Sequence, residues 1–346
     1  MQVLTVHAHH RAGNCALHRH ECDGPPTLAL AILVTTLAAA VSAVGVRFQR
    51  DRAIAAARAA QGSVVVTTRC GPIEVQQAGA GTPLLVIHGS GGGHDQGMAW
   101  ARPLVQQGVQ VIAMSRFGYL RTPRPADASP EAQADAHVCL LDALGIAKAA
   151  VMGVSAGGPS ALQTAIRHPD RVTALVLAVP IAYKPASVTD SAPQISDDQD
   201  DLLLRLLGSD FLFWAALQVA RDPLTRHVLA TPPELVAAAS PQERARVNDL
   251  AERILPVSTR AAGLRDDTRL GKRLGPYALE SIHVPTLVLS AVDDGFGTYA
   301  AAQYTASRIA GARFIGFDNG GHLLVGHDAE VQRAVMTLLH STSRPP

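Results

Sequence analysis

Charged and aromatic residues are scarce in this 346-residue sequence, at 17% and 4% of the chain, and the formal net charge is only +1. So small a net charge gives no general electrostatic attraction to nucleic acid, and we expect no nucleic-acid partner. Disorder is excluded for most of the chain, because 47% of the residues are hydrophobic. The length allows one large domain with an insertion, or two small domains.

Cysteine is scarce as well. The four cysteines, Cys15, Cys22, Cys70 and Cys139, are too scattered to suggest a disulfide framework, and no two have the spacing of a metal-binding pair. We therefore expect unpaired thiols. The phosphate-binding patterns G-x-x-x-x-G-K-S/T and G-x-G-x-x-G are also missing, so a nucleotide site is disfavoured and the sequence predicts neither a cofactor nor a metal.

One long apolar run stands out. Residues Thr27–Val46 carry no charge over about the twenty residues that a helix needs to cross a bilayer. We interpret the run as an uncleaved transmembrane anchor, which makes a lipid bilayer a partner of the chain. A cleaved signal peptide is the main alternative, because Val41-Ser42-Ala43 offers the small residues that a signal peptidase accepts. A buried core helix fits less well with apolarity on every side.

The flanks of the apolar run predict its orientation. Arg11 and Arg19 precede it. The arginines that closely follow it are Arg47, Arg50, Arg52 and Arg58. The positive-inside rule then places the C-terminal side, with everything large, in the cytoplasm.

The segments on either side of the anchor are polar. Residues 1–26 form a leader without apolar periodicity, which we expect to be disordered. Its five histidines and Cys22 could bind a transition metal, but nothing suggests a fold that would fix such ligands. Residues 47–61 are rich in arginine and predict a helical stalk that lies against or leaves the membrane surface.

From Gly62 onward, over residues 62–346, short β-branched runs alternate with helical stretches, which is typical of an α/β sheet. The predicted strands are Ser63–Thr68, Ile73–Gln77, Leu84–His88, Val109–Met114, Ala149–Val154, Ala174–Val179, Thr286–Ser290 and Arg313–Phe317. The main helices predicted between them are Glu131–Leu144, Gly158–Arg167, Ala300–Ile309 and Glu330–His340.

Residues 181–284 break this alternation, and we expect them to form a helical insertion over one edge of the sheet. Its predicted helices include Leu202–Leu207, Phe211–Ala220 and Pro241–Ile254. Long insertions with helices of their own are usually lids or binding elements.

The pentapeptide Gly153–Gly157 has the pattern G-x-S-x-G, directly after an apolar strand and before a helical segment. In that context the small residues permit a tight strand-to-helix turn, which holds Ser155 in a strained conformation with its hydroxyl exposed. The backbone N–H of Ala156 then points to the place where an oxyanion would form. We therefore predict Ser155 as a nucleophile.

A second oxyanion donor is expected from the glycine-rich segment His88–Gly93, which begins at the end of the predicted strand Leu84–His88. Glycines let the backbone approach a ligand closely. The N–H of Ser90 is the candidate donor, and Gly91 is a candidate substrate contact and an alternative donor. A flexible loop or a phosphate cradle is the other interpretation.

A serine hydroxyl needs an adjacent base, which is itself oriented by an acid. Asp293 and Asp294 follow the strand Thr286–Ser290, and His322 follows the last strand. This gives the chain order serine, acid, histidine that is expected of a nucleophile elbow on an α/β sheet. His94 and His327 are the competing histidines.

At this point the sequence resembles the α/β-hydrolase superfamily from about Gly62 to the end. The matching pieces are HGSGGG at His88–Gly93, SRFGYLRT at Ser115–Thr122, GVSAGG at Gly153–Gly158, VPTLVLSAVDD at Val284–Asp294 and GGHLLVGH at Gly320–His327. The resemblance implies a mostly parallel eight-stranded sheet with helices on both faces and a helical cap. The motifs most resemble those of a bacterial, membrane-anchored subgroup.

The resemblance also bears on single residues. It assigns the acid to Asp294 rather than Asp293, although Ala291 stands where the family has glycine and the doubled aspartate leaves the choice open. Arg116 matches the residue after the fourth strand and receives no catalytic role.

These residues predict a serine hydrolase that acts through an acyl-enzyme, and the resemblance to the superfamily implies a small-molecule carboxylic ester, lactone or thioester as its substrate. Carbon–carbon bond hydrolysis and cofactor-free perhydrolysis use the same triad and remain open, as does a membrane-tethered binding protein without turnover. Phe211 and Trp214 in the insertion suggest an apolar acyl or alcohol pocket. Packing of their helix against the sheet is at least as good an interpretation.

Overall fold

The computed structural model describes residues 26–189, 208–271 and 273–342. By its internal contacts the chain divides into two units, residues 1–49 and residues 50–346. Helix α1 (Pro26–Ala60) is continuous across the division.

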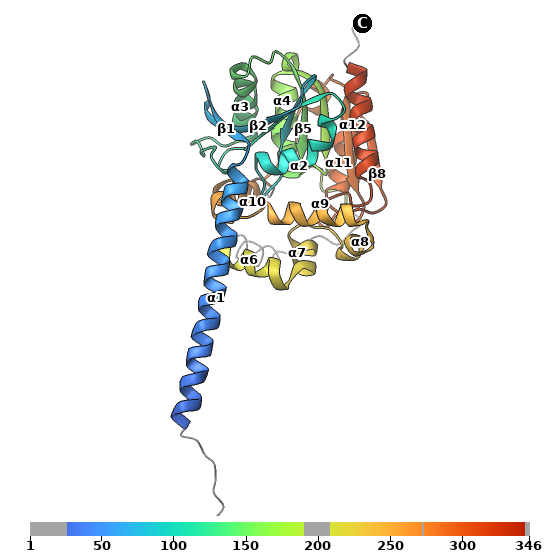
Figure 1. Ribbon diagram of the computed structural model, residues 1–346. Coiled ribbons are helices and arrows are strands. Elements are labelled where there is room, and N and C mark those ends of the chain that lie inside the picture. Colours follow the sequence, from blue (N-terminus) through green and yellow to red (C-terminus); the bar gives the residue numbers. More distant parts are fainter. Residues whose placement is uncertain (1–25, 190–207, 272, 343–346) are drawn as a thin grey trace, which may run out of the picture. The chain divides into compact units, whose positions relative to one another are not determined.

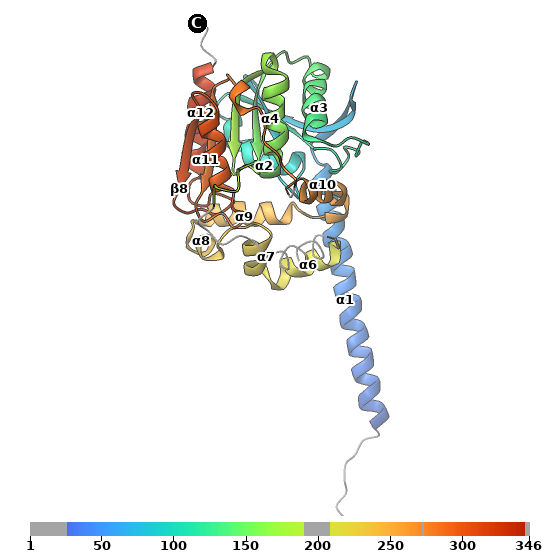
Figure 2. The same cartoon turned by 180° about the vertical axis from the view of Figure 1, so that it is seen from behind.

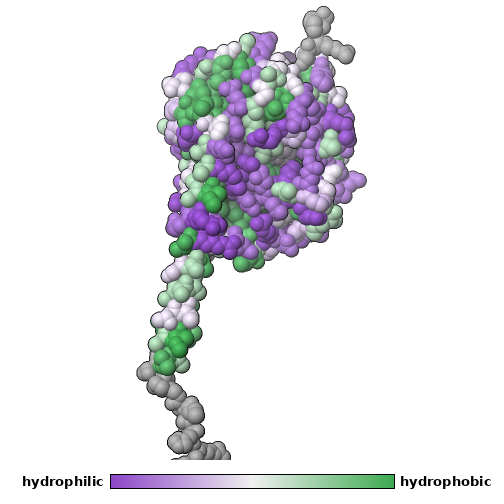
Figure 3. Space-filling view, in the orientation of Figure 1, coloured by the Kyte–Doolittle hydropathy of each residue, from purple (hydrophilic) through white to green (hydrophobic). Residues whose placement is uncertain are grey.

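The described part of the N-terminal unit is the first part of α1. Its large apolar side chains are exposed (Figure 3); they are Leu28, Leu30, Ile32, Leu33, Val34, Leu37, Val41, Val44 and Val46. By length and composition this helix can cross a membrane, and a signal sequence near the N-terminus passes the same test. Residues 1–25 of the predicted leader, with all its histidines, lie outside the described residues.

The second unit is built on one eight-stranded sheet with the order β1-β2-β4-β3-β5-β6-β7-β8 (Figure 1). Strand β2 runs antiparallel to both of its neighbours, and the other neighbouring pairs are parallel. The strands are β1 (Ser63–Thr68), β2 (Gly71–Ala78), β3 (Thr82–Ile87), β4 (Val109–Met114), β5 (Ala149–Val154), β6 (Val172–Ala178), β7 (Thr286–Ala291) and β8 (Arg313–Phe317). The predicted mostly parallel, eight-stranded sheet is confirmed.

Helices cover both faces of the sheet (Figures 1 and 2). Alternate residues of β3 separate into two cores, because successive side chains of a strand point to opposite faces. Leu84 and Val86 pack with α2 (His94–Val105) and α12 (Asp328–Thr342). Leu85 and Ile87 belong to the opposite core, which contains side chains of α3 (Pro130–Ala143), α4 (Gly158–Arg167) and α11 (Tyr299–Arg308). This double cover explains why β5 and β7 are buried at every residue.

The insertion between β6 and β7 is helical in its described part. Its helices are α6 (Asp210–Val219), α7 (Arg221–His227), α8 (Pro233–Ala238), α9 (Pro241–Glu252) and α10 (Ala261–Gly271). They gather at one end of the sheet in both Figure 1 and Figure 2. The predicted helices Phe211–Ala220 and Pro241–Ile254 correspond to α6 and α9, whereas Leu202–Leu207 lies outside the described residues.

The last part of α1 packs within the second unit. The indole N–H of Trp214 donates to the carboxylate of Asp51 over 3.0 Å. Arg52 forms an ion pair of 2.7 Å with Asp210 at the start of α6. These two contacts join the first half of the predicted stalk to the insertion.

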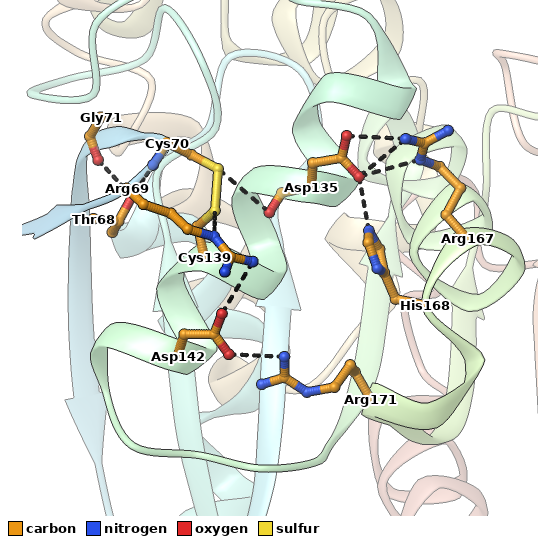
Figure 4. Close-up of a disulfide and its surroundings, with 10 residues drawn as sticks. All are labelled: Thr68, Arg69, Cys70, Gly71, Asp135, Cys139, Asp142, Arg167, His168 and Arg171. Carbon is orange, nitrogen blue, oxygen red and sulfur yellow. Dashed lines mark hydrogen bonds and ion pairs between the residues drawn. A yellow bond between two sulfur atoms is a disulfide. The ribbon is translucent and has the colours of Figure 1, made fainter.

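A disulfide joins Cys70 to Cys139, with Cα atoms 5.9 Å apart (Figure 4). Cys70 lies in the turn between β1 and β2, and Cys139 lies in α3. The prediction of unpaired thiols is therefore wrong for this pair. The two cysteines are 69 residues apart in sequence, and only the packing of α3 against β1 brings them together. The spacing of the two cysteines along the chain therefore could not predict that contact.

The disulfide makes a testable contribution to stability. Replacing both cysteines in a Cys70→Ala, Cys139→Ala variant opens the 69-residue loop, which should lower the free energy of unfolding by about 4 kcal/mol through the chain entropy of the unfolded state. Urea denaturation of the purified protein measures this loss. A Cys15→Ala, Cys22→Ala variant is the matched control and should keep the wild-type value. Equal free energies of unfolding in the two double variants would show that the disulfide does not stabilise the protein.

Candidate active site

Ser155 stands at the junction of β5 and α4, in a left-handed backbone conformation with φ of +51°. Few residues other than glycine adopt this conformation without strain, and such strain at a strand-to-helix turn is typical of a nucleophile elbow. The neighbouring glycines leave no room for a side chain. A Cβ on Gly153 would lie 2.6 Å from the Cβ of Ala161, and one on Gly157 would lie 2.3 Å from the carbonyl oxygen of Ile87.

Asp294 and His322 form a hydrogen-bonded pair at the same edge of the sheet. The Nδ1 atom of His322 lies 2.8 Å from Oδ2 of Asp294, whose side chain is fully buried. Asp294 is held in turn by the Thr298 hydroxyl and by the backbone N–H of Phe296 at 2.9 Å. The carboxylate is therefore fixed from several directions, and it accepts the Nδ1–H of His322 when the ring is in that tautomer.

Asp293 has a different position from its neighbour. Its two carboxylate oxygens accept the backbone N–H groups of Gly320 (3.2 Å) and Gly321 (2.8 Å). Asp293 thus braces the turn that carries His322, whereas Asp294 contacts the imidazole itself. The sequence left the choice between these two aspartates open, and the geometry favours Asp294 as the partner of the histidine.

The two competing histidines are occupied elsewhere. His94 is fully buried, with Nε2 at 2.8 Å from the carbonyl oxygen of Ala59 and 3.5 Å from Glu74. His327 stacks on Phe317 with ring centroids 4.2 Å apart. Neither is among the described residues that line the cavity beside Ser155.

The glycine-rich loop after β3 lies against the nucleophile. A Cβ on Gly89 would approach the Cβ of Ser155 to 2.9 Å, so only glycine permits this contact. The N–H of Gly89 donates to the side-chain oxygen of Gln96 over 2.9 Å. Gly89, Ser90 and Gly91 all line the same cavity as Ser155. Ala156 lies at the start of the helical turn after Ser155, where backbone N–H groups have no partner within the helix.

A cavity of about 450 Å³ opens beside Ser155 and His322. This volume is within the range of small-molecule sites. Much of its wall is apolar and includes Trp100, Ile181, Leu229, Ile254, Leu264 and Phe296. The polar part of the wall includes Lys184, Asp267 and Thr268. Within the described residues no cluster of three or more histidine, cysteine or acidic side chains is arranged to hold a metal ion.

Two predicted substrate contacts lie elsewhere in the structure. Phe211 is exposed on α6 and packs near Trp214, with ring centroids 5.8 Å apart. Trp214 is buried and directs its indole N–H to Asp51. The described lining of the cavity includes neither residue. Their assignment to a substrate pocket is corrected accordingly, because the apolar side of α6 serves to pack the insertion and the end of α1.

Asp267 on α10 was not predicted from the sequence, and it reaches the cavity wall with its side chain almost completely buried. No signal in the sequence separates it from the neighbouring Asp266, which forms a surface ion pair with Arg124. Only the folded structure, in which α10 lies against the glycine-rich loop, reveals the importance of Asp267.

Comparison with known proteins identifies the fold family. Residues 82–328 match the family model described as alpha/beta hydrolase fold. The structure of an alpha/beta hydrolase fold protein from Nakamurella multipartita is similar, with a TM-score of 0.63 and 29% identity over 81% of this chain and 99% of that chain.

Two curated relatives differ in how much of them is matched. The 2-hydroxymuconate semialdehyde hydrolase of Pseudomonas sp. (strain CF600) is 43% identical over 107 residues, which is 30% of this chain and 38% of the relative. The uncharacterized hydrolase YcgS of Bacillus subtilis (strain 168) is 25% identical over 75% of this chain and 91% of its own length. With most of the second unit inside the family match, the chain belongs to the α/β-hydrolase fold family.

Proposed function

We propose that this protein is a serine hydrolase that cleaves a carboxylic ester, lactone or thioester through an acyl-enzyme. The observation that carries the proposal is the left-handed conformation of Ser155 in a cavity that also contains His322, itself hydrogen-bonded to the buried Asp294. A strained serine beside an oriented histidine is the arrangement that nucleophilic catalysis requires.

The proposed reaction has two halves. The Ser155 hydroxyl attacks the carbonyl carbon while Nε2 of His322 takes its proton, and Asp294 supports the charge that develops on the ring. The N–H groups of Ser90 and Ala156 stabilise the oxyanion. His322 then protonates the leaving group, and a water molecule activated by the same histidine releases the acid and restores Ser155.

The cavity supports a substrate with a sizeable apolar part. Its volume of about 450 Å³ and its aliphatic and aromatic side chains suit an acyl or alcohol group of several carbons. The apolar contacts come from the core and the insertion together, because Trp100 lies on α2 and Leu264 lies on α10. We propose that these residues, rather than Phe211 and Trp214, set the chain-length preference.

Carbon–carbon bond hydrolysis is the second candidate. The observation that favours it is the 43% identity over 107 residues to a 2-hydroxymuconate semialdehyde hydrolase. The match spans 38% of that relative, so it carries less weight than the composition of the cavity. The same nucleophile and histidine serve both reactions, and only the substrate distinguishes them.

We further propose that the second unit lies on the oxidising side of the membrane. Disulfides persist in extracytoplasmic compartments and are rare in the cytoplasm, where thiols are kept reduced. The Cys70–Cys139 disulfide therefore opposes the orientation predicted from the arginines that flank α1. That prediction depends on a small excess of arginine after the apolar run, and the disulfide is the stronger indication. The apolar part of α1 would act as the anchor.

Covalent labelling tests the nucleophile. A fluorophosphonate probe should label the wild-type protein, and Ser155→Ala should abolish the label because alanine lacks the hydroxyl oxygen that would bond to phosphorus. A panel of p-nitrophenyl esters of increasing chain length then defines the acyl preference, with 2-hydroxymuconate semialdehyde as the competing substrate. Labelling that survives Ser155→Ala would refute the proposal.

The two aspartates provide a matched pair of variants. Asp294→Asn should lower kcat by about 10³–10⁴-fold, because the amide stabilises the wrong tautomer of the histidine. Asp293→Asn should cost about tenfold or less, since it weakens only hydrogen bonds to the backbone of the histidine turn. Steady-state ester hydrolysis measures both. The assignment fails when the larger loss belongs to Asp293→Asn.

Thiol chemistry and protease access test the compartment. On a Cys15→Ser, Cys22→Ser background expressed in bacteria, the denatured protein should react with a maleimide only after reduction. Protease added to spheroplasts should digest the second unit, because it lies outside the cytoplasm. Two free thiols together with protection from protease would instead support the cytoplasmic orientation.

A further inference from the structure

Helix α10 of the insertion is tied to the glycine-rich loop by a buried carboxylate. Asp267 accepts a hydrogen bond of 3.0 Å from the Ser90 hydroxyl through Oδ2. The same carboxylate forms a two-pronged ion pair with Arg116, at 2.8 and 2.6 Å, and accepts the hydroxyl of Tyr119. The side chains of Asp267 and Arg116 are 5% and 2% exposed, so solvent screens their interaction only weakly.

Arg116 extends this contact to the start of the loop. Its Nε–H donates to the carbonyl oxygen of His88 over 2.9 Å, and its backbone N–H donates to Nε2 of His88 over 3.0 Å. Burial holds the pKa of His88 well below its usual range, and the positive charge of Arg116 lowers it further, so the ring is neutral. Because Nε2 accepts, the ring proton is on Nδ1, which lies 2.7 Å from the carbonyl oxygen of Gly89.

The protonation states of the cluster fit this arrangement. Burial, and next the charge of Asp267, raise the pKa of Tyr119 well above its usual range, so its hydroxyl stays protonated and donates. Burial alone would lower the pKa of Arg116, but the interactions with Asp267 and Tyr119 together outweigh it and raise that pKa. One carboxylate thus faces three donors, and Ser90 is the donor that belongs to the loop.

A second ion pair, in which the insertion supplies the positive charge, holds the other end of the loop. Arg260, just before α10, forms a buried ion pair of 2.8 Å with Asp95 of α2 and donates to the carbonyl oxygen of Gly92. In the first pair the insertion supplies the acid, and in the second it supplies the base. The two ties therefore fix both ends of the segment between Gly89 and Gly92.

The hydrogen bonds and ion pairs from outside the loop are important because the glycine-rich loop itself can adopt many backbone conformations. Ser90 stands between glycines, and Gly91 has a φ of +69°. Glycine backbone has little conformational preference of its own. An oxyanion donor contributes to catalysis only when it is held in place before the reaction.

We propose that Asp267 is a positioning residue, which through the Ser90 hydroxyl and Arg116 aims the Ser90 N–H at the oxyanion. This inference rests on the proposed function. It assigns α10 to the fixed catalytic framework and gives Arg116 the task of holding the loop to it. The substrate does not contact Asp267 in this role.

The test compares Asp267→Asn with Asp266→Asn, a neighbouring aspartate of the same helix whose ion pair with Arg124 lies at the surface. With the p-nitrophenyl ester that the wild type cleaves best, Asp267→Asn should lower kcat by about 10–100-fold, since a misaligned oxyanion donor affects the transition state more than the bound substrate. KM should stay within about threefold, and Asp266→Asn should stay within about twofold of wild type in kcat.

A transition-state analogue separates positioning from general destabilisation. The Ki of a trifluoromethyl ketone that matches the ester should rise by the factor by which kcat/KM falls, because the ketone adduct carries the same oxyanion. Circular dichroism at the assay temperature verifies that each variant is folded.

Ser90→Ala covers the case in which Asp267→Asn does not fold. It keeps the Ser90 N–H and the Arg116–Asp267 ion pair but removes the hydroxyl link, and kcat should fall about tenfold. The inference is overturned when either Ser90→Ala or a folded Asp267→Asn keeps kcat within about twofold of wild type, or when kcat/KM falls without a change in Ki. Failure of the fluorophosphonate probe to label Ser155 in the wild-type protein would instead refute the proposed function.

Discussion

The backbone strain at Ser155 is the constraint on which the rest of the site depends. A left-handed serine between β5 and α4 exists only because its surroundings carry no side chains at three points. Gly153 makes room for Ala161, Gly157 for the end of β3, and Gly89 for Ser155 itself. These contacts bring the glycine-rich loop and the nucleophile into van der Waals contact, which gives the two predicted oxyanion donors a common target.

Buried ion pairs connect the core of the second unit to its helical insertion. The Arg116–Asp267 and Arg260–Asp95 pairs each join a residue of the core to one of the insertion. A buried ion pair contributes little net stability, because desolvation of the charges offsets their attraction. Breaking it is costly, since one charge is left without a partner. Such pairs fix geometry more than they increase stability, which suits a helix that forms one wall of the cavity.

The sequence predicted those features that have a local signature. Hydrophobic runs gave the strands of the sheet to within a few residues, and the pattern Gly153–Gly157 identified the strained turn. The order of serine, acid and histidine brought Asp294 and His322 into consideration. The choice of Asp294 over Asp293 needed the structure, because both follow the same strand and differ only in which way their side chains point.

Features that depend on distant parts of the chain were out of reach. The Cys70–Cys139 disulfide and the contact of Asp267 with Ser90 join residues 69 and 177 positions apart. Neither has a pattern along the chain. Phe211 and Trp214 were misassigned because an apolar helix face has the same sequence pattern whether it contacts a ligand or another helix.

A crystal structure of the protein after reaction with a fluorophosphonate tests the proposed nucleophile and oxyanion donors together. We expect a bond between phosphorus and the Ser155 oxygen, with one phosphoryl oxygen within about 3.1 Å of the backbone nitrogens of both Ser90 and Ala156. An adduct on another residue, or a phosphoryl oxygen directed away from both nitrogens, would contradict these assignments.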